Sequence, residues 1–549
     1  MPKKSDMYSE LLAAETGTIV KAAGRGPDVA LVYPNSYHVG MSSLGFQVVY
    51  GLGNQFPGAR VERYFHDLPV AETLESRLPI ARVDVVAFSV SFVMDYLNVL
   101  DVLDRAGLPM LARERSAKMP LVVAGGTAIQ VNRLPIYDVC DVLVLGAAER
   151  TLGPLLEACA KWRNDRPSLL RALSALPGVE VTAGAQVAAG VDLGVEIPSV
   201  RSAGFSPYSS VRSAGFSPYS QGDPAASTTI RAKARTPNEC ALEDLAPHPA
   251  HSVILTDKTE FAGKCLIEIS RGCPYHCTFC WAGHNIIPYI AYPAESVIAV
   301  IEEQRARARS FGFIAAAVGA HPGIDEICAY CDRHDLLVSF SSLRVEDVTK
   351  GMLRSLARSG QRSITLAPET ASPRLRRLLG KRIEDESVFG VVERAVGLGM
   401  RDVRLYFMVG LPTENDEEAA AIAEFVARLR ERFVNASRPK GAIGTITINC
   451  GVYVPYPNTP LPRIGPPPEG PIVRARLKRL VRALRAIPNV HAAAESVDLA
   501  RAQGILANGD RRALDLLRLA HERKGHWRSA LRAFAASPAK DGQRGQADA

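Results

Sequence analysis

Two long blocks of this sequence alternate strand-length apolar runs with helical patterns, and this alternation restricts the possible folds more than any other feature. The first block covers residues 27–165 and contains the runs VALVYP, VDVVAFSVS, PLVVAGG and DVLVLGAAE. Each run is apolar on both faces of a strand, which is typical of a parallel sheet covered by helices on both sides. We therefore expect an α/β domain with a doubly wound parallel sheet, which binds ligands at the carboxyl ends of its strands.

The second block covers residues 256–465 and begins with the run CLIEIS. Six alternations of strand and helix with one open end predict a partial (β/α)6 barrel, and its chemistry belongs at the carboxyl ends of the strands. Residues 166–255 separate the two blocks and are rich in Gly, Ser, Pro and Ala between about 185 and 240. The segment SVRSAGFSPYS occurs there twice in succession, at 199–209 and 210–220. Two copies are too few for a solenoid, so we interpret this stretch as a flexible linker.

The remaining segments are an N-terminal extension (1–26), a basic helical C-terminal region (466–535) and a tail (536–549) that we expect to be disordered. Between Arg474 and Arg532 there are 14 Lys or Arg residues against 5 Asp or Glu residues. Such a surplus is common on the solvent-exposed face of amphipathic helices, although it would also suit an anionic partner. The chain shows neither a signal-peptide pattern nor a run of about 18 apolar residues, so we expect a cytoplasmic protein without a membrane span.

The ten cysteines include one group of three within eight positions. Cys273, Cys277 and Cys280 have the spacing C-x3-C-x2-C in a loop after the first predicted strand of the barrel. A zinc site would need a fourth ligand, for which the nearby candidates are His276, His284 and Cys265. However, the other closely spaced pair, Cys328 and Cys331, falls in a predicted helix at positions i and i+3, where we expect both side chains to be buried packing residues rather than metal ligands. In an iron–sulfur cubane, three thiolates would leave one iron atom free to bind an external chelating group.

With Phe279 before its last cysteine, this loop resembles the cluster loop of the radical S-adenosylmethionine (SAM) enzymes. In that family, three cysteines bind a 4Fe-4S cluster whose free iron is chelated by SAM. An electron from the cluster splits SAM and gives a 5′-deoxyadenosyl radical, which abstracts hydrogen from unactivated carbon. The resemblance implies that Cys273, Cys277 and Cys280 are the catalytic metal ligands, and that an external one-electron reductant is a partner.

The resemblance also implies that residues near the ends of later barrel strands bind SAM. The candidates are Phe279, Val318, Gly319, Ser341, Ser342, Arg344, Glu369, Gly410 and Leu411. The match is loose at Val318-Gly319-Ala320, where the family usually has two glycines and an acidic residue.

The order of the two domains resembles the cobalamin-binding subclass of this family. The segments LVYPNSYHVGMSSLGFQVVY, VAFSVSF, LVVAGGTAI and VLGAAERTLGPLLE resemble successive parts of a vitamin B12 domain. The resemblance implies that the nucleotide tail of cobalamin lies against Ser89, Ser91, Gly125, Gly126 and Thr127. The corrin ring would lie over the stretch from Asn35 to Gly45, which includes His38. The cobalt-ligating pattern D-x-H-x-x-G is absent, so cobalt has either no protein ligand or His38 alone.

We therefore expect a radical SAM enzyme, and the resemblance implies methyl transfer from methylcobalamin to an unactivated carbon of a small molecule or biosynthetic intermediate. The alternative is a rearrangement, cyclisation or oxidation without methyl transfer. An RNA-modifying methylthiotransferase would need a second cysteine trio in the first block, which contains only Cys140 and Cys159, so we do not expect nucleic acid as a partner. A non-catalytic SAM or cobalamin sensor would not require all three cluster cysteines.

Overall fold

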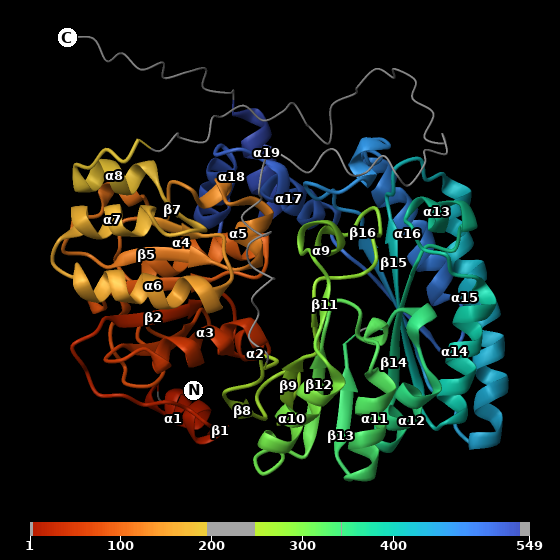
Figure 1. The fold of residues 1–549 in the computed structure, drawn as a ribbon. Coiled ribbons are helices and arrows are strands. Elements are labelled where there is room, and N and C mark those ends of the chain that lie inside the picture. The colour runs from red at the N-terminus through yellow and green to blue at the C-terminus, as the bar shows by residue number, and fades with distance from the viewer. Residues whose placement is uncertain (1–3, 195–247, 342, 538–549) are drawn as a thin grey trace, which may run out of the picture.

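The computed structural model describes residues 4–194, 248–341 and 343–537, which form two α/β domains and a group of C-terminal helices (Figure 1). The tandem repeat, Ser342 and the end of the chain from residue 538 lie outside the described residues. Among the residues that the structure describes, no helix is long and apolar enough to cross a membrane.

The first domain is built on a six-stranded sheet with the strand order β3-β2-β4-β5-β6-β7. Its strands are β2 (Asp28–Tyr33), β3 (Arg60–Phe65), β4 (Val85–Ser89), β5 (Leu121–Gly125), β6 (Val142–Val144) and β7 (Val179–Val181). All neighbours are parallel except β6 and β7. The chain changes direction across the sheet between β2 and β4, which is where doubly wound sheets bind their ligands. The predicted fold class of this domain is confirmed.

Helices cover both faces of this sheet. They are α2 (Tyr37–Met41), α3 (Leu44–Gln55), α4 (Tyr96–Arg105), α5 (Thr127–Asn132), α6 (Ala148–Lys161), α7 (Arg166–Ser174) and α8 (Ala183–Ala189), and α1 (Lys4–Ala13) precedes the sheet. Helices α3 and α6 pack against each other, while α4 and α5 contact the C-terminal helices. Right-handed crossovers explain this division, because the chain leaves β2 in one direction and β4 in the other.

Strand β3 was not predicted, because its sequence RVERYF carries three charged residues. The structure buries these charges in ion pairs rather than exposing them. Arg63 is fully buried and lies 2.7 Å from Glu15 and 2.6 Å from Glu75, and Arg60 lies 2.9 Å from Asp28. Pairing of this kind is what allows a charged side chain to occupy a core position.

The second domain is a partial barrel of parallel strands. These are β9 (Cys265–Glu268), β12 (Ser310–Ile314), β13 (Leu337–Phe340), β14 (Ser363–Glu369), β15 (Asp402–Val409), β16 (Ile446–Val452) and β17 (Val490–Ala494). A parallel bridge between Leu343 and Leu366 joins the three-stranded part to the four-stranded part. The six predicted strands are all present. The seventh strand, β17, lies in the segment that we expected to be helical and pairs with β16.

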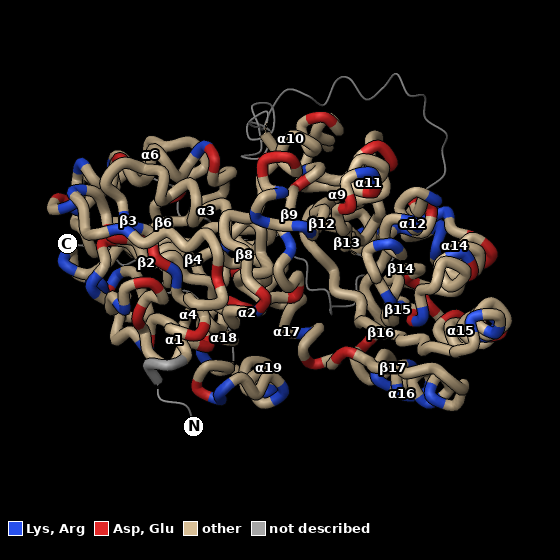
Figure 2. The backbone as a smooth tube through the Cα atoms, turned by 90° about the horizontal axis from the view of Figure 1, so that it is seen from below, with Lys and Arg blue, Asp and Glu red and all other residues tan. Residues whose placement is uncertain are grey.

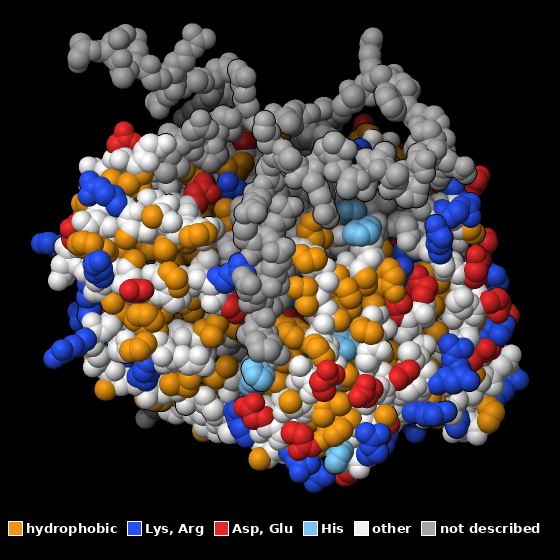
Figure 3. Space-filling view, in the orientation of Figure 1, with side chains coloured by type: hydrophobic (Ala, Val, Ile, Leu, Met, Phe, Trp, Pro, Cys, Tyr) orange, Lys and Arg blue, Asp and Glu red, His pale blue; other side chains and the backbone are white. Residues whose placement is uncertain are grey.

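The outer helices of the barrel are α10 (Ala294–Gln304), α11 (Ile324–Arg333), α12 (Lys350–Arg358), α14 (Asp385–Gly397), α15 (Asp416–Ser437) and α16 (Gly470–Arg485). Side chains of both charges lie along the edge formed by α14 and α15 (Figure 3). Arg432 and Glu393, for example, join these two helices at 2.5 Å. Exposed pairs of this kind contribute little to stability, about 0–1 kcal/mol each.

The last helices return to the first domain. They are α17 (Val497–Asn508), α18 (Ala513–Glu522) and α19 (Trp527–Ala536), and they lie beside α4 and α5 (Figure 1). The amide of Asn132 donates hydrogen bonds of 2.8 Å to the carbonyls of Leu506 and Gly509, and Arg511 forms an ion pair with Asp138. Seen from below, the two domains lie side by side with α17 between them (Figure 2).

Candidate active site

The cysteine loop lies at the carboxyl end of the first barrel strand. After β9 the chain passes through the short strand β10 (Ser270–Arg271) and turns at Gly272. Gly272 has a φ of +77°, and a Cβ atom there would lie 2.5 Å from the carbonyl oxygen of Ile286. Only glycine suits this turn, because a side chain would be strained and would also collide with the backbone. The turn directs the cysteines toward the mouth of the barrel.

The three thiols are neighbours within this loop. Cys277 is buried, whereas Cys273 and Cys280 are partly exposed, and Cys280 stands at the N-terminus of α9 (Trp281–Asn285). Burial raises the pKa of the Cys273 thiol, and the nearby thiols of Cys280 and Cys277 raise it further. Protonated thiols of this kind must lose their protons when they bind a metal.

Both histidines of the loop bind backbone carbonyls. His276 Nδ1 lies 2.9 Å from the oxygen of Gly283, and His284 Nε2 lies 3.1 Å from the oxygen of Cys277. In residues 4–194, 248–341 and 343–537, no three His, Cys, Asp or Glu side chains are placed to hold a single metal ion. A cubane cluster binds each thiolate through a different iron atom, so its ligands need not converge on one point.

The loop is tied to the opposite side of the barrel mouth by Thr278. Its backbone N–H donates to the carbonyl of Leu379 at 3.1 Å, and its hydroxyl donates to the carbonyl of Leu378 at 2.8 Å. Its own carbonyl accepts a 2.9 Å hydrogen bond from the N–H of Leu461. These bonds fix the backbone between the second and third cysteines.

Arg344, one of the predicted residues, lies directly on the cysteine loop. Its Nη1 donates to the sulfur of Cys277 at 3.1 Å, and its guanidinium stacks over the ring of Tyr275 at 3.8 Å. The Tyr275 hydroxyl donates in turn to Asp347. Burial raises the pKa of the Asp347 carboxyl, although the Tyr275 hydrogen bond and Arg344 oppose this shift. Tyr275 and Asp347 were not predicted, since nothing in their spacing links them.

Several buried polar atoms at the barrel mouth have no hydrogen-bond partner among the described residues. They include Trp281 Nε1, Arg344 Nε, Asp347 Oδ2 and Tyr453 Oη. Buried polar atoms in folded proteins nearly always have a partner, so a group of unsatisfied donors and acceptors in one place is unusual. These atoms fit a site that holds a polar ligand.

Other predicted residues lie around the same mouth. Val318 is buried, and a Cβ atom on Gly319 would lie 2.6 Å from the backbone oxygen of Asp347. Ser341 follows β13 and is partly exposed, while its neighbour Ser342 is outside the described residues. The ends of the second and third barrel strands are therefore in contact here.

The ends of β14 and β15 carry two buried ion pairs. Glu369 has a φ of +66° and lies 2.7 Å from Lys381. Gly410 has a φ of +88°, and its N–H donates to Glu414 at 2.7 Å. Burial raises the pKa of Glu414 to about 7, even though the Gly410 N–H and Arg476, at 3.2 Å, favour its charged form. Neither Lys381 nor Glu414 was predicted.

Phe279 and Leu411 contribute to an apolar cluster beside the cysteine loop. The fully or nearly fully buried members of this cluster are Leu375, Leu379, Leu411, Tyr453 and Leu461, and Phe279 packs against them. This cluster covers one side of the loop with apolar side chains.

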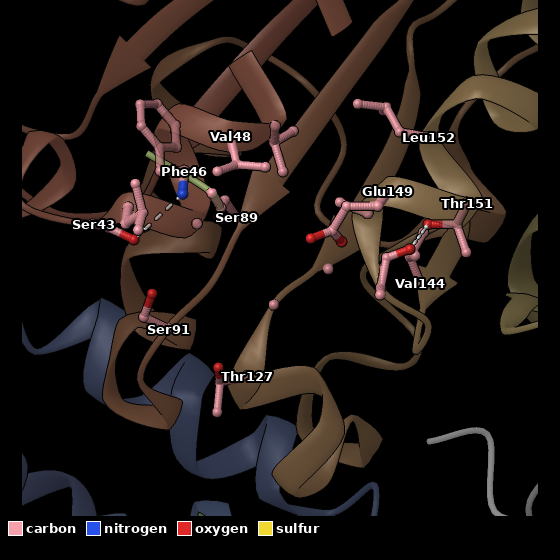
Figure 4. Close-up of a pocket in the computed structure, with 18 of the residues that line it drawn as sticks. Ser43, Phe46, Val48, Ser89, Ser91, Thr127, Val144, Glu149, Thr151 and Leu152 are labelled. Atoms are coloured by element: carbon pink, nitrogen blue, oxygen red, sulfur yellow. Dashed lines mark hydrogen bonds between the residues drawn. The ribbon is translucent and has the colours of Figure 1, made fainter. Parts of the chain in front are cut away.

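A cavity of about 610 Å³ lies between the two domains (Figure 4). The first domain lines it with the carboxyl ends of β4 and β5 and with the beginnings of α3 and α6. The barrel contributes Glu268, Arg271, Ile286 and Ile314. The structure brings together here five predicted residues, namely Ser89, Ser91, Gly125, Gly126 and Thr127. The volume of this cavity is within the usual range of ligand pockets.

Two glycines of the cavity lining differ in what surrounds them. Gly126 has a φ of +107°, and a Cβ atom there would lie 2.5 Å from the carbonyl oxygen of Val90. Gly45, near the start of α3, has no atom within 4 Å of the place where a Cβ would be. The space in front of Gly45 is therefore open.

An ion-pair bridge crosses the cavity wall. Arg271, next to the cysteine loop, lies 2.8 Å from Glu149 of α6 and 2.7 Å from Glu268 of β9. Figure 4 shows Glu149 reaching into the cavity from the side of α6. The two carboxylates raise the pKa of Arg271 although its burial opposes this. Glu149 stands in the segment VLGAAERTLGPLLE, which the sequence predicts as part of the cobalamin-binding domain. Arg271 was not predicted, because its partner Glu149 is 122 positions away in the sequence.

The structure does not place Asn35 and His38 among the residues that line the cavity. The Asn35 amide donates to Asp95 at 2.9 Å, and burial raises the pKa of Asp95 to about 6. The His38 side chain is 54% exposed and lies 3.6 Å from Glu260. In this structure both residues serve contacts outside the cavity.

Comparisons with known proteins agree with this architecture. Residues 267–426 match the family model described as the radical SAM superfamily, and residues 45–181 match the one described as radical SAM proteins, N-terminal. An uncharacterized protein of Methanocaldococcus jannaschii is 23% identical over 434 residues, which cover 79% of this chain and 78% of that protein.

Two further similarities are weaker. An uncharacterized methyltransferase of Pyrococcus horikoshii is 25% identical over 198 residues, which cover 34% of this chain and 42% of that protein. The solved structure of the radical S-adenosylmethionine methyltransferase TsrM from Kitasatospora setae is 15% identical in sequence. It covers 79% of this chain and 74% of its own, with a TM-score of 0.47.

Proposed function

Since this chain belongs to the radical SAM superfamily, we propose that it is an enzyme with two cofactor sites that face each other across the domain boundary. In this proposal Cys273, Cys277 and Cys280 hold a 4Fe-4S cluster, SAM binds at the barrel mouth, and cobalamin binds in the cavity of the first domain. When bound, these groups supply one-electron cleavage of SAM and carriage of a methyl group. The proposed reaction is methyl transfer to an unactivated carbon of a small molecule or biosynthetic intermediate, with an external one-electron reductant.

One observation carries the proposal: the cysteine loop and the cavity are adjacent. Arg271 lies two residues before Cys273 and also contributes to the cavity wall. The cavity lies at the switch point of the parallel sheet, and its small residues leave room for a flat ring system and its tail. The relative from Pyrococcus horikoshii that is named a methyltransferase supports the choice of methyl transfer among radical SAM reactions.

The chain's own residues would hold and shield these groups. Arg344 donates a hydrogen bond to the Cys277 sulfur and so helps to fix the position of this ligand in the loop. The unsatisfied atoms of Trp281 and Asp347 offer a donor and an acceptor for the polar groups of SAM. The apolar cluster around Leu411 limits the access of water to one side of the loop.

The test is anaerobic purification followed by measurement of iron, sulfide and corrinoid in the same sample. Reduced, cluster-loaded protein should cleave SAM, and Cys277→Ala should lose both the iron and the cleavage. Cys159→Ala is the matched control, because this buried cysteine lies in the first domain and behaves there as a small apolar residue.

The product distinguishes the two radical reactions. A methylated product together with 5′-deoxyadenosine supports methyl transfer, whereas 5′-deoxyadenosine with an unmethylated product indicates a rearrangement, cyclisation or oxidation. Protein that takes up a full cluster but never binds corrinoid would contradict the methyl-transfer proposal.

A further inference from the structure

A second concave site lies at the outer edge of the barrel, where α16, α17 and α19 meet. It encloses about 320 Å³ and is lined by Arg474, Asp498, Arg501, Arg528, Leu531 and Arg532. Helices α16 and α17 contact each other, and α19 packs against α17. None of these six residues belongs to the cavity between the domains or to the cysteine loop.

The lining of this site, which we call the arginine pocket, is strongly cationic. Four of its six lining residues are arginines, and one is an aspartate. Asp498 lies 3.1 Å from Arg474 and 2.8 Å from Arg528, so its charge is already shared between two arginines. Within the described part of the chain, Arg532 has no hydrogen-bond or ion-pair partner. Like charges gathered in one place repel each other unless an anion joins them.

The arginine pocket lies on the same side of the barrel as the cysteine loop. Helix α17 begins at Val497, directly after the carboxyl end of the edge strand β17. Val473, next to Arg474, faces Gly410 at the end of β15, where a Cβ atom would lie 3.1 Å from the Val473 side chain. The pocket therefore lies on the side of the barrel toward which the carboxyl ends of its strands point.

We propose that the arginine pocket binds a phosphate or pyrophosphate group of a small molecule. The planar guanidinium fork matches phosphate oxygens through paired hydrogen bonds, and several forks around one cavity suit a compact anion of high charge. The backbone of a nucleic acid would instead need an extended basic track. Under the proposed function this phosphate belongs to the substrate, but phosphate binding itself requires neither cofactor.

The experiment measures binding of inorganic pyrophosphate to the full-length protein by isothermal titration calorimetry. The protein is prepared without cluster or corrinoid, and the ionic strength is held constant because binding of anions depends on salt. Arg532→Gln should weaken binding at least tenfold, and Arg532→Glu should weaken it more. Arg482→Gln is the control, since Arg482 is an exposed arginine of α16 outside the pocket.

Three results would overturn the proposal. One is a protein that does not bind pyrophosphate at millimolar concentration, and another is unchanged affinity in Arg532→Gln. The third is binding of a short single-stranded RNA that Arg532→Gln abolishes, without binding of pyrophosphate. Pyrophosphate binding in this experiment requires no cofactor. A protein that does not bind pyrophosphate could therefore still cleave SAM, and a protein that does not cleave SAM could still bind pyrophosphate.

Discussion

The open space in front of Gly45 leads to a direct test of the cavity. Gly45 is exposed, lies in the first turn of α3, and has nothing within 4 Å of its missing Cβ atom. Glycine is a poor helix residue, so its presence where a larger side chain would fit suggests that the space itself is needed. We expect Gly45→Trp to fill the entrance of the cavity without disturbing the fold.

The substitution should affect two quantities to different extents, namely the free energy of unfolding and the affinity for corrinoid. Replacing Gly by Trp improves helix propensity by roughly 0.5 kcal/mol, and the first turn of a helix gains less than its interior. The free energy of unfolding should therefore change by no more than about 1 kcal/mol. Corrinoid affinity, in contrast, should fall at least tenfold, which corresponds to about 1.4 kcal/mol or more of binding free energy.

The assay is a titration of the purified protein with hydroxocobalamin, followed by its absorbance spectrum, together with denaturant unfolding. Gly397→Trp is the matched control, because Gly397 is also an exposed helical glycine with open space around it, at the end of α14. If Gly45→Trp binds the corrinoid as tightly as this control, the cavity is not the corrinoid site. If it unfolds more easily by several kcal/mol, the space was not open.

Three further predictions concern single interactions. A double-mutant cycle of Arg271→Gln and Glu149→Gln should give a coupling energy of about 0.5–2 kcal/mol in denaturant unfolding, since this pair is only partly exposed to solvent. A coupling energy near zero would show that this ion pair does not stabilise the contact between the domains. Because the pKa of Glu414 is raised in the folded state, the native protein keeps a proton that the unfolded chain releases. The free energy of unfolding should therefore decline by up to about 3 kcal/mol as the pH rises from about 4.5 to about 7. Glu414→Gln should remove this decline, and an unchanged pH profile in that variant would assign the effect to another group. Gly126→Ala should destabilise the protein by about 1–3 kcal/mol because Gly126 has a positive φ. Gly125→Ala should be tolerated, since its Cβ atom would make only ordinary contacts at 3.5 Å. Equal thermal stability of the two variants would contradict this reasoning.

Sequence patterns predicted those elements whose burial is visible in their composition. The strands β2, β4, β5 and β6 have runs of Val, Ala and Leu, and the barrel strands alternate regularly with helices. Strand β3 was missed because its charges are neutralised by residues far away in the sequence, such as Glu15 for Arg63. Strand β17 was missed because VHAAA is short and follows the basic helix α16.

The candidate site also combines features that the sequence predicts with features that it does not. The spacing of the cysteines and the small residues after β4 and β5 are local features, and the structure places them at the barrel mouth and around the cavity. The contacts of Arg344 with Cys277, 67 positions apart, and of Arg271 with Glu149 depend on the packing of separate elements. No local pattern contains that information, so these pairs could be found only from the folded chain.

The return of α17, α18 and α19 to the first domain has a consequence for biosynthesis. The face formed by α4 and α5 is completed by residues beyond position 497, which leave the ribosome only after the whole barrel has been made. During translation the apolar surface of the first domain therefore stays exposed until these last helices are synthesised and pack against it. We expect truncated products that lack these helices to depend on chaperones or to aggregate.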